Sequence, residues 1–146
     1  MPTIDDILTK LANAKVFSTC DVKHAFWSIK LDEESSLLTT FETPFGRLRW
    51  RRLPFGVIPA PEIFQARMHE ALAGLKGVAC IADDILIAGS GATIVEATAD
   101  HNKNLRALME RYREKGLKLN SEKLKLNRTT TVFCGHELTQ QYLTIL

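Results

Sequence analysis

The sequence predicts an α+β fold of the split βαβ (ferredoxin-like) type, in which an antiparallel sheet carries helices on one face. At residues 78–88 an apolar run, two adjacent aspartates and a second apolar run follow one another, as in a hairpin of two buried strands. A strand-like stretch precedes this hairpin and a long amphipathic helix follows it. When an insertion of roughly residues 29–58 is set aside, the predicted order is strand, helix, strand, strand, helix, strand.

The composition fits a single globular domain. The chain has 146 residues, enough to bury a core, and its formal net charge of +2 does not by itself indicate a nucleic-acid-binding protein. No apolar run approaches the length of a membrane span and no signal peptide is recognisable, so we expect an intracellular protein. Cys20, Cys80 and Cys134 lack the spacing of metal ligands, and their apolar neighbours predict buried free thiols in a reducing compartment.

The first half of the chain predicts a helix, a strand and a hairpin. Thr3 can cap a helix whose first turn holds Asp5 and Asp6, and this acidic pair is therefore expected to be structural. A β-branched and aromatic stretch over residues 15–22 predicts a strand that ends near Asp21. The sequence then predicts a polar helix start at residues 31–35, a hairpin over residues 41–53 with its turn at residues 44–46, and a rigid connector over residues 53–61.

The second half predicts two helices on either side of the aspartate hairpin. Apolar periodicity predicts helices over residues 61–75 and from about residue 91 to Gly116, a residue type that commonly follows a helix end. His101 lies on the apolar face of the second helix, which predicts a hydrogen-bonded histidine in the core. The remaining predictions are a short strand at residues 117–119, a turn at residues 120–123, and a final hairpin of residues 130–138 with residues 142–145.

Asp83 and Asp84 stand at the tip of the predicted hairpin. Two neighbouring carboxylates repel each other, and their desolvation is costly unless a cation compensates the charge. Carboxylate oxygens bind hard divalent cations such as Mg2+, whereas a plain polar turn would bond the aspartates to its own backbone. In the split βαβ topology Asp21 is expected to approach this pair. Three such carboxylates would suit two divalent ions that stabilise the attacking and leaving oxygens of phosphoryl transfer.

A basic stretch follows the turn of the predicted hairpin over residues 41–53. Residues 47–52 hold four arginines around Trp50, and these side chains could contact phosphates and stack on bases. A solvated edge strand protected by its charge explains the same pattern equally well, so both interpretations stay open. In the connector that follows, Gly56 permits close approach of the backbone to a ligand.

Seven stretches of the chain, in order and together covering almost its whole length, resemble the palm and inner fingers of a reverse transcriptase. The similarity is closest to the Pol polyproteins of Gypsy-type LTR retrotransposons. The matching stretches are residues 2–8, 17–27, 53–57, 60–65, 81–86, 116–120 and 133–136. The resemblance implies a polymerase palm fold with a fingers insertion, and an RNA-directed DNA polymerase that extends a primer with deoxynucleotides.

The resemblance implies roles for several residues. Asp21, Asp83 and Asp84, with the backbone of Val22, would hold two Mg2+ ions, for which Mn2+ could substitute. Phe26 would be an aromatic gate beneath the sugar, Phe55 and Gly56 would pack near the nascent base pair, and Lys123 would lie near the leaving pyrophosphate. The nucleic-acid-binding residues expected from the basic stretch and from the resemblance together are Arg49, Trp50, Arg52, Gln65, Phe133, Gly135 and His136.

The resemblance also bounds the function that we expect of this chain. It covers the palm and part of the fingers, and lacks the N-terminal fingers segment, the thumb, the connection and the RNase H domain, so we expect little activity from the chain alone. The expected partners are an RNA or DNA template with its primer, a dNTP and those further polyprotein domains, and no membrane. The expected location is the cytoplasm or a retroelement particle, with the nucleus as an alternative.

Several positions depart from the family pattern, among them Leu48, Arg51 and Ile58. Ile81 stands where an aromatic residue is usual, and Cys20 stands where an aliphatic residue is usual. An alternative function is therefore a non-catalytic retroelement remnant that binds nucleic acid or a protein partner. The sequence leaves the oligomeric state open.

Overall fold

The computed structural model describes residues 3–140 and 143–145 and divides into two compact units. The main-sheet unit comprises residues 1–23 and 65–146, and the insert unit comprises residues 24–64. Each unit is described separately below.

Four strands in the described part of the main-sheet unit form an antiparallel sheet in the order β4-β5-β1-β6. Their bounds are β1 (Ala14–Asp21), β4 (Val78–Ile81), β5 (Asp84–Ser90) and β6 (Lys125–Arg128). The first strand lies between the hairpin and the last strand, which is the split βαβ arrangement that the order of elements predicted. The two central strands form the core, and Ile85, Leu86 and Ile87 of β5 are fully buried.

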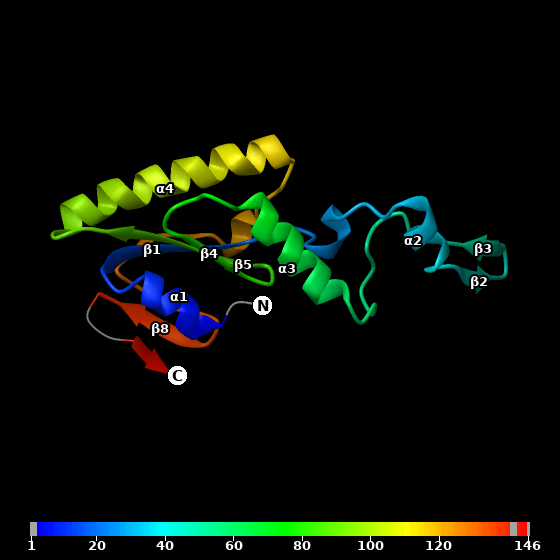
Figure 1. Ribbon diagram of the computed structural model, residues 1–146, viewed down its shortest axis with the longest axis horizontal. Coiled ribbons are helices and arrows are strands. Elements are labelled where there is room, and N and C mark those ends of the chain that lie inside the picture. The colour runs from blue at the N-terminus through cyan, green and yellow to red at the C-terminus, as the bar shows by residue number, and fades with distance from the viewer. Residues whose placement is uncertain (1–2, 141–142, 146) are drawn as a thin grey trace. The chain divides into compact units, whose positions relative to one another are not determined.

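Helix α4 (Ile94–Lys115) covers one face of this sheet (Figure 1). The Thr93 side chain accepts a hydrogen bond from the Glu96 N–H at its start, and Gly116 ends it in the left-handed conformation, with φ 69°. His101 is fully buried with its Nε2 2.7 Å from the Ser18 Oγ, which confirms the predicted core histidine. Among the described residues, neither α4 nor any other helix is long and apolar enough to cross a membrane.

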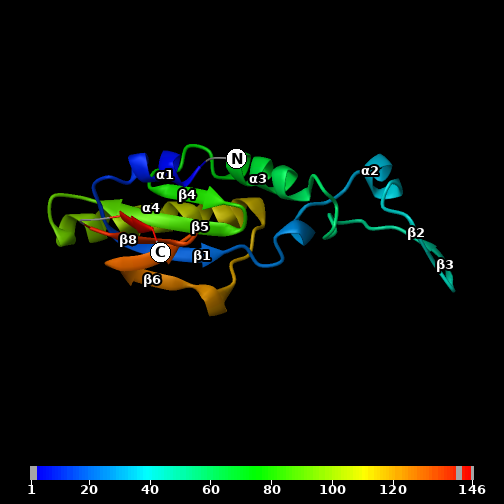
Figure 2. The same ribbon diagram turned by 90° about the horizontal axis from the view of Figure 1, so that it is seen from below.

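The opposite face of the sheet is covered by α1 (Ile4–Lys10) together with β7 (Thr130–Phe133) and β8 (His136–Thr139). Viewed from below, α1 and β8 lie in front of the sheet and α4 lies behind it (Figure 2). The predicted Thr3 cap is present and forms a capping box with Asp6. The buried side chains of this second layer are Ile7, Ala14, Phe17, Leu86, Ala88, Phe133 and Leu138.

The insert unit contains short elements: η1 (Phe26–Ser28), α2 (Glu33–Leu37), β2 (Phe41–Thr43) and β3 (Gly46–Leu48). The predicted hairpin is shorter than expected because the chain leaves it after Leu48. Trp50 bonds elsewhere: its N–H donates to the Thr39 Oγ1 over 2.9 Å and its carbonyl accepts from the Ser36 Oγ.

The predicted strand at residues 117–119 is wrong. Only Leu119 pairs, in an isolated bridge with Val22, and the fourth strand of the sheet is β6 instead. β6 has no apolar pattern that would predict a strand, because Lys125–Arg128 has a single apolar residue and every residue of the strand is exposed. The helix predicted over residues 61–75 is α3 (Ala60–Ala71), which ends before Gly74, a residue with φ 80°.

The stretch predicted as one strand over residues 130–138 is divided between two strands. Cys134 and Gly135 form a two-residue turn between β7 and β8, with positive φ values of 49° and 77°. This turn leaves Cys134 exposed, so its predicted burial is wrong, whereas Cys20 is buried as expected. The predicted final pairing is present between β8 and β9 (Leu143–Ile145), and Tyr142 lies outside the described residues.

The close packing of α4 on β5 predicts that Gly89→Ala is destabilising. A Cβ at Gly89 would overlap the carbonyl oxygen of Ala97 and the backbone of His101. Overpacking of this kind costs about 1–3 kcal/mol and occasionally more, measurable as a loss in the free energy of unfolding by urea. The control Ser90→Ala, at an exposed neighbour, should change that free energy by less than about 0.5 kcal/mol. Unchanged stability of Gly89→Ala would contradict the close packing.

Candidate active site

Asp21 and Asp84 lie opposite each other on the two central strands. They are the last pair in the register of β1 with β5, and beyond them the Val22 N–H donates to the Asp83 carbonyl over 3.1 Å. The Asp21 side chain is only 16% exposed. The approach of Asp21 to the aspartate hairpin, expected from the topology, is therefore present in the structure.

The hairpin that carries Asp83 and Asp84 has a strained turn. Ile81 pairs with Asp84, which leaves Ala82 and Asp83 as the two central residues. Ala82 has φ 53° and Asp83 does not have a positive φ, the pattern of a type II′ turn, in which glycine is favoured at the first central position. A side chain held in such a conformation costs about 1–3 kcal/mol, a cost often found at functional sites.

Electrostatics at this position disfavour the carboxylate form of Asp84. Desolvation by burial, a hydrogen bond with Asp21 and repulsion from Asp21 and Asp83 raise the pKa of Asp84 to about 6, against a smaller opposite effect of Lys123. The charge of Lys123 therefore offsets only part of the repulsion between the carboxylates that the site brings together.

Lys123 forms an ion pair with Asp21. It ends the turn η2 (Ser121–Lys123), and its Nζ lies 2.9 Å from the Asp21 Oδ2. The turn is fixed to β1 because the Asn120 N–H donates to the Asp21 carbonyl over 3.0 Å. The hydrogen bond with Asp21 and the charge of Asp21 raise the pKa of Lys123, so its ammonium is firmly protonated.

The donor set only partly fits a metal site. Two carboxylates, Asp21 and Asp84, meet across the strands and offer the oxygen ligands that hard cations prefer. Asp83 is exposed in the turn beside them. In the part of the chain that the structure describes, no three His, Cys, Asp or Glu side chains are gathered in a way that could hold a metal ion. Asp21 and Asp84 therefore fit as shared ligands of a hard cation, and Asp83 would have to turn toward them.

The two cysteines beside the site are not suited to metal ligation. Cys20 and Cys80 both pair with Ile85, on the strands that flank β5. Burial is the main cause that raises the pKa of each thiol to about 12. Because the thiolate is the metal ligand and the nucleophile, these protonated thiols are structural residues.

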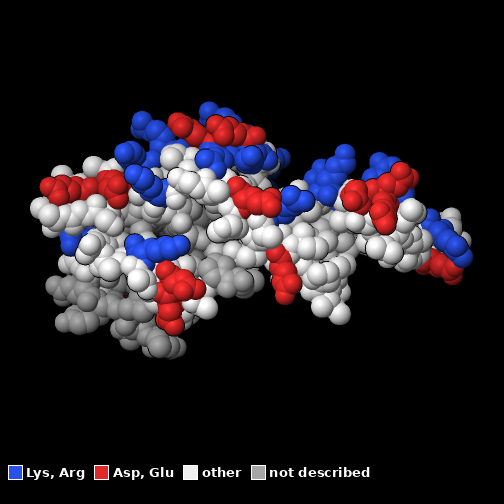
Figure 3. All heavy atoms as spheres, in the orientation of Figure 1, with Lys and Arg blue, Asp and Glu red and all other residues white. Residues whose placement is uncertain are grey.

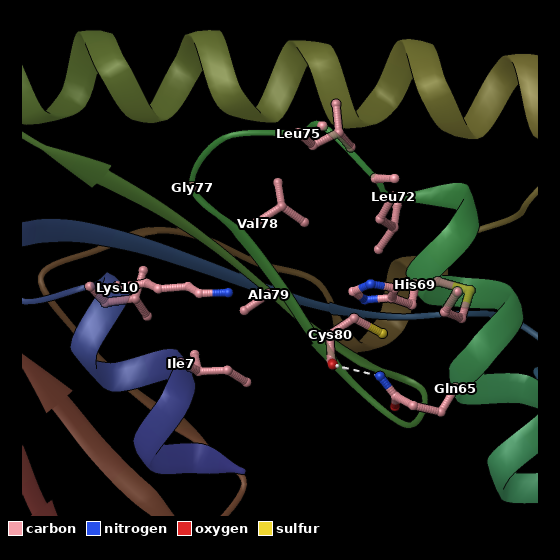
Figure 4. Close-up of a pocket in the computed structure, with 14 residues that line it drawn as sticks. Ile7, Lys10, Gln65, His69, Leu72, Leu75, Gly77, Val78, Ala79 and Cys80 are labelled. Carbon is pink, nitrogen blue, oxygen red and sulfur yellow. Dashed lines mark hydrogen bonds between the residues drawn. The ribbon is translucent and has the colours of Figure 1, made fainter. Parts of the chain in front are cut away.

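Gln65 contacts the aspartate hairpin from inside the protein. Its side chain is 6% exposed, its Nε2 donates to the Cys80 carbonyl over 3.1 Å, and its Oε1 accepts from the Ala82 N–H over 2.6 Å. Figure 4 shows it beside a cavity of about 320 Å³ between α1, α3 and β4. The expected nucleic-acid contact of Gln65 does not agree with this position, since the side chain is buried and both ends of its amide already bond to the backbone.

Phe26 and Phe55, both expected to bind the nucleotide, lie together in the insert unit. Their ring centroids are 5.1 Å apart, and Phe26 also packs edge-on against Phe64 at 5.7 Å. Phe55 remains 68% exposed, and Gly56 next to it has φ 86° with no atom near the position of a Cβ. The exposed ring of Phe55 and the open backbone of Gly56 leave room for a ligand.

The basic stretch begins in β3, where Arg47 pairs with Glu42, but Arg49 to Arg52 follow the end of that strand and lie outside the hairpin. The Trp50 ring packs edge-on against Trp27 at 5.1 Å, so part of its surface is already covered. Arg49 lies 3.8 Å from Glu33, and the Arg52 Nη1 donates weakly to the Trp27 and Ser28 carbonyls. These contacts are long, and both guanidinium groups could exchange them for phosphates. On the face seen in Figure 3, Lys and Arg alternate with Asp and Glu over α4 and form no purely basic patch there.

Phe133, Gly135 and His136, which were expected in the hairpin near the primer end, differ in how exposed they are. Phe133 is 3% exposed and packs in the core, so its ring is not available for a surface contact. Gly135 is exposed in the turn, and the His136 Nδ1 lies 2.9 Å from the Cys134 carbonyl oxygen. Of these three residues, Gly135 and His136 lie at the turn and remain accessible to a partner, and Phe133 does not.

The raised pKa of Asp84 predicts the pH dependence of stability. A carboxyl group whose pKa is higher in the folded chain than in the unfolded chain binds its proton more tightly when folded. The contribution of Asp84 to the free energy of unfolding should therefore fall as the pH rises from roughly 4, the unperturbed aspartate value, to about 6, and stay level above that.

The variant Asp84→Asn has no ionisable group at this position, so its stability is compared with that of the unsubstituted chain. We expect urea titrations at several pH values between about 4 and about 8 to give the free energy of unfolding of both proteins. As the pH rises through the lower half of that range, the free energy of unfolding of the variant should increase relative to that of the unsubstituted chain. A constant difference between the two proteins would contradict the raised pKa.

Comparison with known proteins gives a consistent result. The family model described as "Reverse transcriptase (RNA-dependent DNA polymerase)" matches residues 1–138. The chain is 36% identical over 135 residues to the uncharacterized protein K02A2.6 of Caenorhabditis elegans, covering 92% of this chain and 10% of that protein. It is 33% identical over 139 residues to the enzymatic polyprotein of cauliflower mosaic virus (strain Strasbourg), covering 94% of this chain and 20% of that polyprotein.

Solved structures show the same fold. A foamy viral protease–reverse transcriptase in complex with double-stranded DNA matches with a TM-score of 0.81 and 28% identity, over 96% of this chain and 24% of that one. The same kind of protein in complex with an RNA/DNA hybrid matches with a TM-score of 0.78 and 26% identity, over 95% of this chain and 19% of that one. The chain spans between a tenth and a fifth of the length of the curated relatives named above. With a family match that extends over most of its length and a fold shared with these structures, the chain belongs to the reverse transcriptase (RNA-dependent DNA polymerase) family.

Proposed function

We propose that this chain forms the core of an RNA-directed DNA polymerase, which joins a dNTP to the 3′-hydroxyl of a primer. The observation that carries the proposal is the pairing of Asp21 with Asp84 at the ends of β1 and β5. The resemblance of its motifs supports a finer assignment to a Gypsy-type LTR retrotransposon, as a palm with part of the fingers in the insert unit.

Asp21, Asp83 and Asp84, with the backbone of Val22, are the proposed ligands of two Mg2+ ions, or of Mn2+ in their place. Bound there, two divalent ions would stabilise the attacking and leaving oxygens of the displacement. The protein contributes a rigid backbone for this site. Val22 is bonded to the Asp83 carbonyl through its own N–H, and the Lys23 N–H next to it donates to the Lys118 carbonyl over 2.7 Å.

Lys123 is proposed to act beside the leaving pyrophosphate. In the structure its ammonium partly neutralises Asp21, at 2.9 Å. A cation bound by Asp21 would compete for the same carboxylate oxygens and would free the ammonium to contact phosphate oxygens. Its flexible side chain is 66% exposed, which leaves room for that movement.

The insert unit is proposed to contact the nucleotide and the template–primer. Phe26, Phe55 and Gly56 would bind the nucleotide, with Phe26 under the sugar and the other two near the nascent base pair. Arg49 and Arg52, beside Trp50, and the turn at Gly135 and His136 would contact the nucleic acid. The foamy viral relatives solved with double-stranded DNA and with an RNA/DNA hybrid support nucleic acid as the partner.

Primer extension on an RNA template tests this function. Asp84→Asn should reduce the Mg2+-dependent extension rate at least about 1,000-fold, which corresponds to roughly 4 kcal/mol of lost transition-state stabilisation. Asp5→Asn, at an exposed aspartate in the first turn of α1, is the matched control and should leave the rate unchanged.

Two results would contradict the proposed function. One is extension that persists in Asp84→Asn. The other is the absence of extension together with nucleic-acid binding that is independent of Mg2+, which would indicate a non-catalytic remnant instead.

A further inference from the structure

We propose that Gln65 is a positioning residue whose carboxamide fixes the turn that presents Asp83 and Asp84. The inference rests on the proposed function of these aspartates. It assigns Gln65 a task inside the protein in place of the surface contact expected from the sequence.

The hydrogen bonds of the Gln65 side-chain amide resemble those that one more strand would make at the edge of the sheet. β4 is an edge strand, with β5 on one side only. On its other side the Gln65 amide offers one donor and one acceptor, as a backbone peptide would. Its Nε2 donates to the Cys80 carbonyl over 3.1 Å and its Oε1 accepts from the Ala82 N–H over 2.6 Å, and Figure 4 shows the first of these bonds. Because the side chain is 6% exposed, water does not readily replace either bond.

The residue held in this way is the strained one. Ala82, with φ 53°, directly precedes the two aspartates. A relaxation of Ala82 to a negative φ would rotate the following peptide and carry both carboxylates with it. Two further bonds restrain the same turn: the Cys80 thiol donates to the Ala82 carbonyl over 3.2 Å, and the Val22 N–H donates to the Asp83 carbonyl over 3.1 Å. The Gln65 bond is the one that fixes the N–H of the strained residue.

The position of Gln65 is set by its helix. Met68, on the same helix and in the main-sheet unit, is 2% exposed, so this part of α3 is held by a buried side chain. A glutamate at position 65 would keep the acceptor but lose the donor and add a negative charge near the aspartates. The neutral amide is therefore the side chain that satisfies both backbone groups without adding to the repulsion at the site.

The experiment compares Gln65→Met, which keeps the length and apolar stem but removes both hydrogen-bonding groups, with the unsubstituted chain. Hydrogen exchange followed by NMR should show the Ala82 amide exchanging at least about tenfold faster in the variant, because its buried acceptor is lost. Mg2+ titration should show about tenfold weaker binding. Gln140→Met, the same change at an exposed glutamine, is the control and should alter neither quantity.

Rescue by Ala82→Gly separates positioning from general stability. Glycine adopts a positive φ without strain, so the turn should keep its shape without the Gln65 bonds. The double variant Gln65→Met, Ala82→Gly should therefore recover Mg2+ affinity to within about twofold of the unsubstituted chain, although the hydrogen bonds are still missing.

The proposal is overturned if Gln65→Met leaves both the Ala82 exchange and the Mg2+ affinity unchanged. It is also overturned if glycine at position 82 does not restore binding, or if the amides of Leu86 and Ile87 in the core accelerate as much as that of Ala82. These outcomes differ from a failure of the proposed function, in which the unsubstituted chain itself would show no Mg2+ binding that depends on Asp84.

Discussion

The antiparallel pairing of β1 with β5 is the interaction on which the rest of the structure depends. These two strands form the centre of the sheet, and layers of side chains cover both of their faces, from α4 on one side and from α1, β7 and β8 on the other. The same register that buries Ile85 and Leu86 brings Asp21 opposite Asp84 at the strand ends. A shift of one residue would turn the core side chains to the wrong face and separate the two carboxylates, so fold and site are specified together.

The candidate site concentrates features that weaken the folded state. Burial and neighbouring carboxylates raise the pKa of Asp84, and the turn before it holds an alanine at φ 53°. Lys123 offsets part of the repulsion through Asp21, and the Gln65 amide bonds to the strained peptide. Local conflicts of this kind, compensated by neighbouring groups, are expected where a protein arranges charge for a ligand. A divalent cation would relieve the repulsion that the protein alone leaves in place.

The sequence predicted the parts of the fold that depend on local pattern, and missed those that depend on distant neighbours. Hydrophobic periodicity and caps were sufficient for α4, with its Gly116 end, and for the hairpin of Asp83 and Asp84. β6 was missed because its pairing with β1, and not its own polar residues, makes it a strand. For the site, the split βαβ topology was sufficient to predict that Asp21 approaches Asp83 and Asp84. The ion pair of Lys123 with Asp21 and the hydrogen bond of the Gln65 side chain with the Ala82 N–H did not follow from it, since each joins a side chain to a residue far away in the sequence. In the turn of the aspartate hairpin, the strain is local to Ala82, which occupies the first central position with a positive φ.

The most direct test of the central claim is to locate bound Mn2+ by paramagnetic broadening of amide signals in the NMR spectrum of the chain. The pairing of Asp21 with Asp84 as a divalent cation site predicts that broadening is strongest at Val22 and at Ala82 to Ile85, that excess Mg2+ reverses it, and that Asp84→Asn abolishes it. Broadening centred on another acidic stretch, such as Asp5 and Asp6 in α1, or broadening unchanged by Asp84→Asn, would contradict the account.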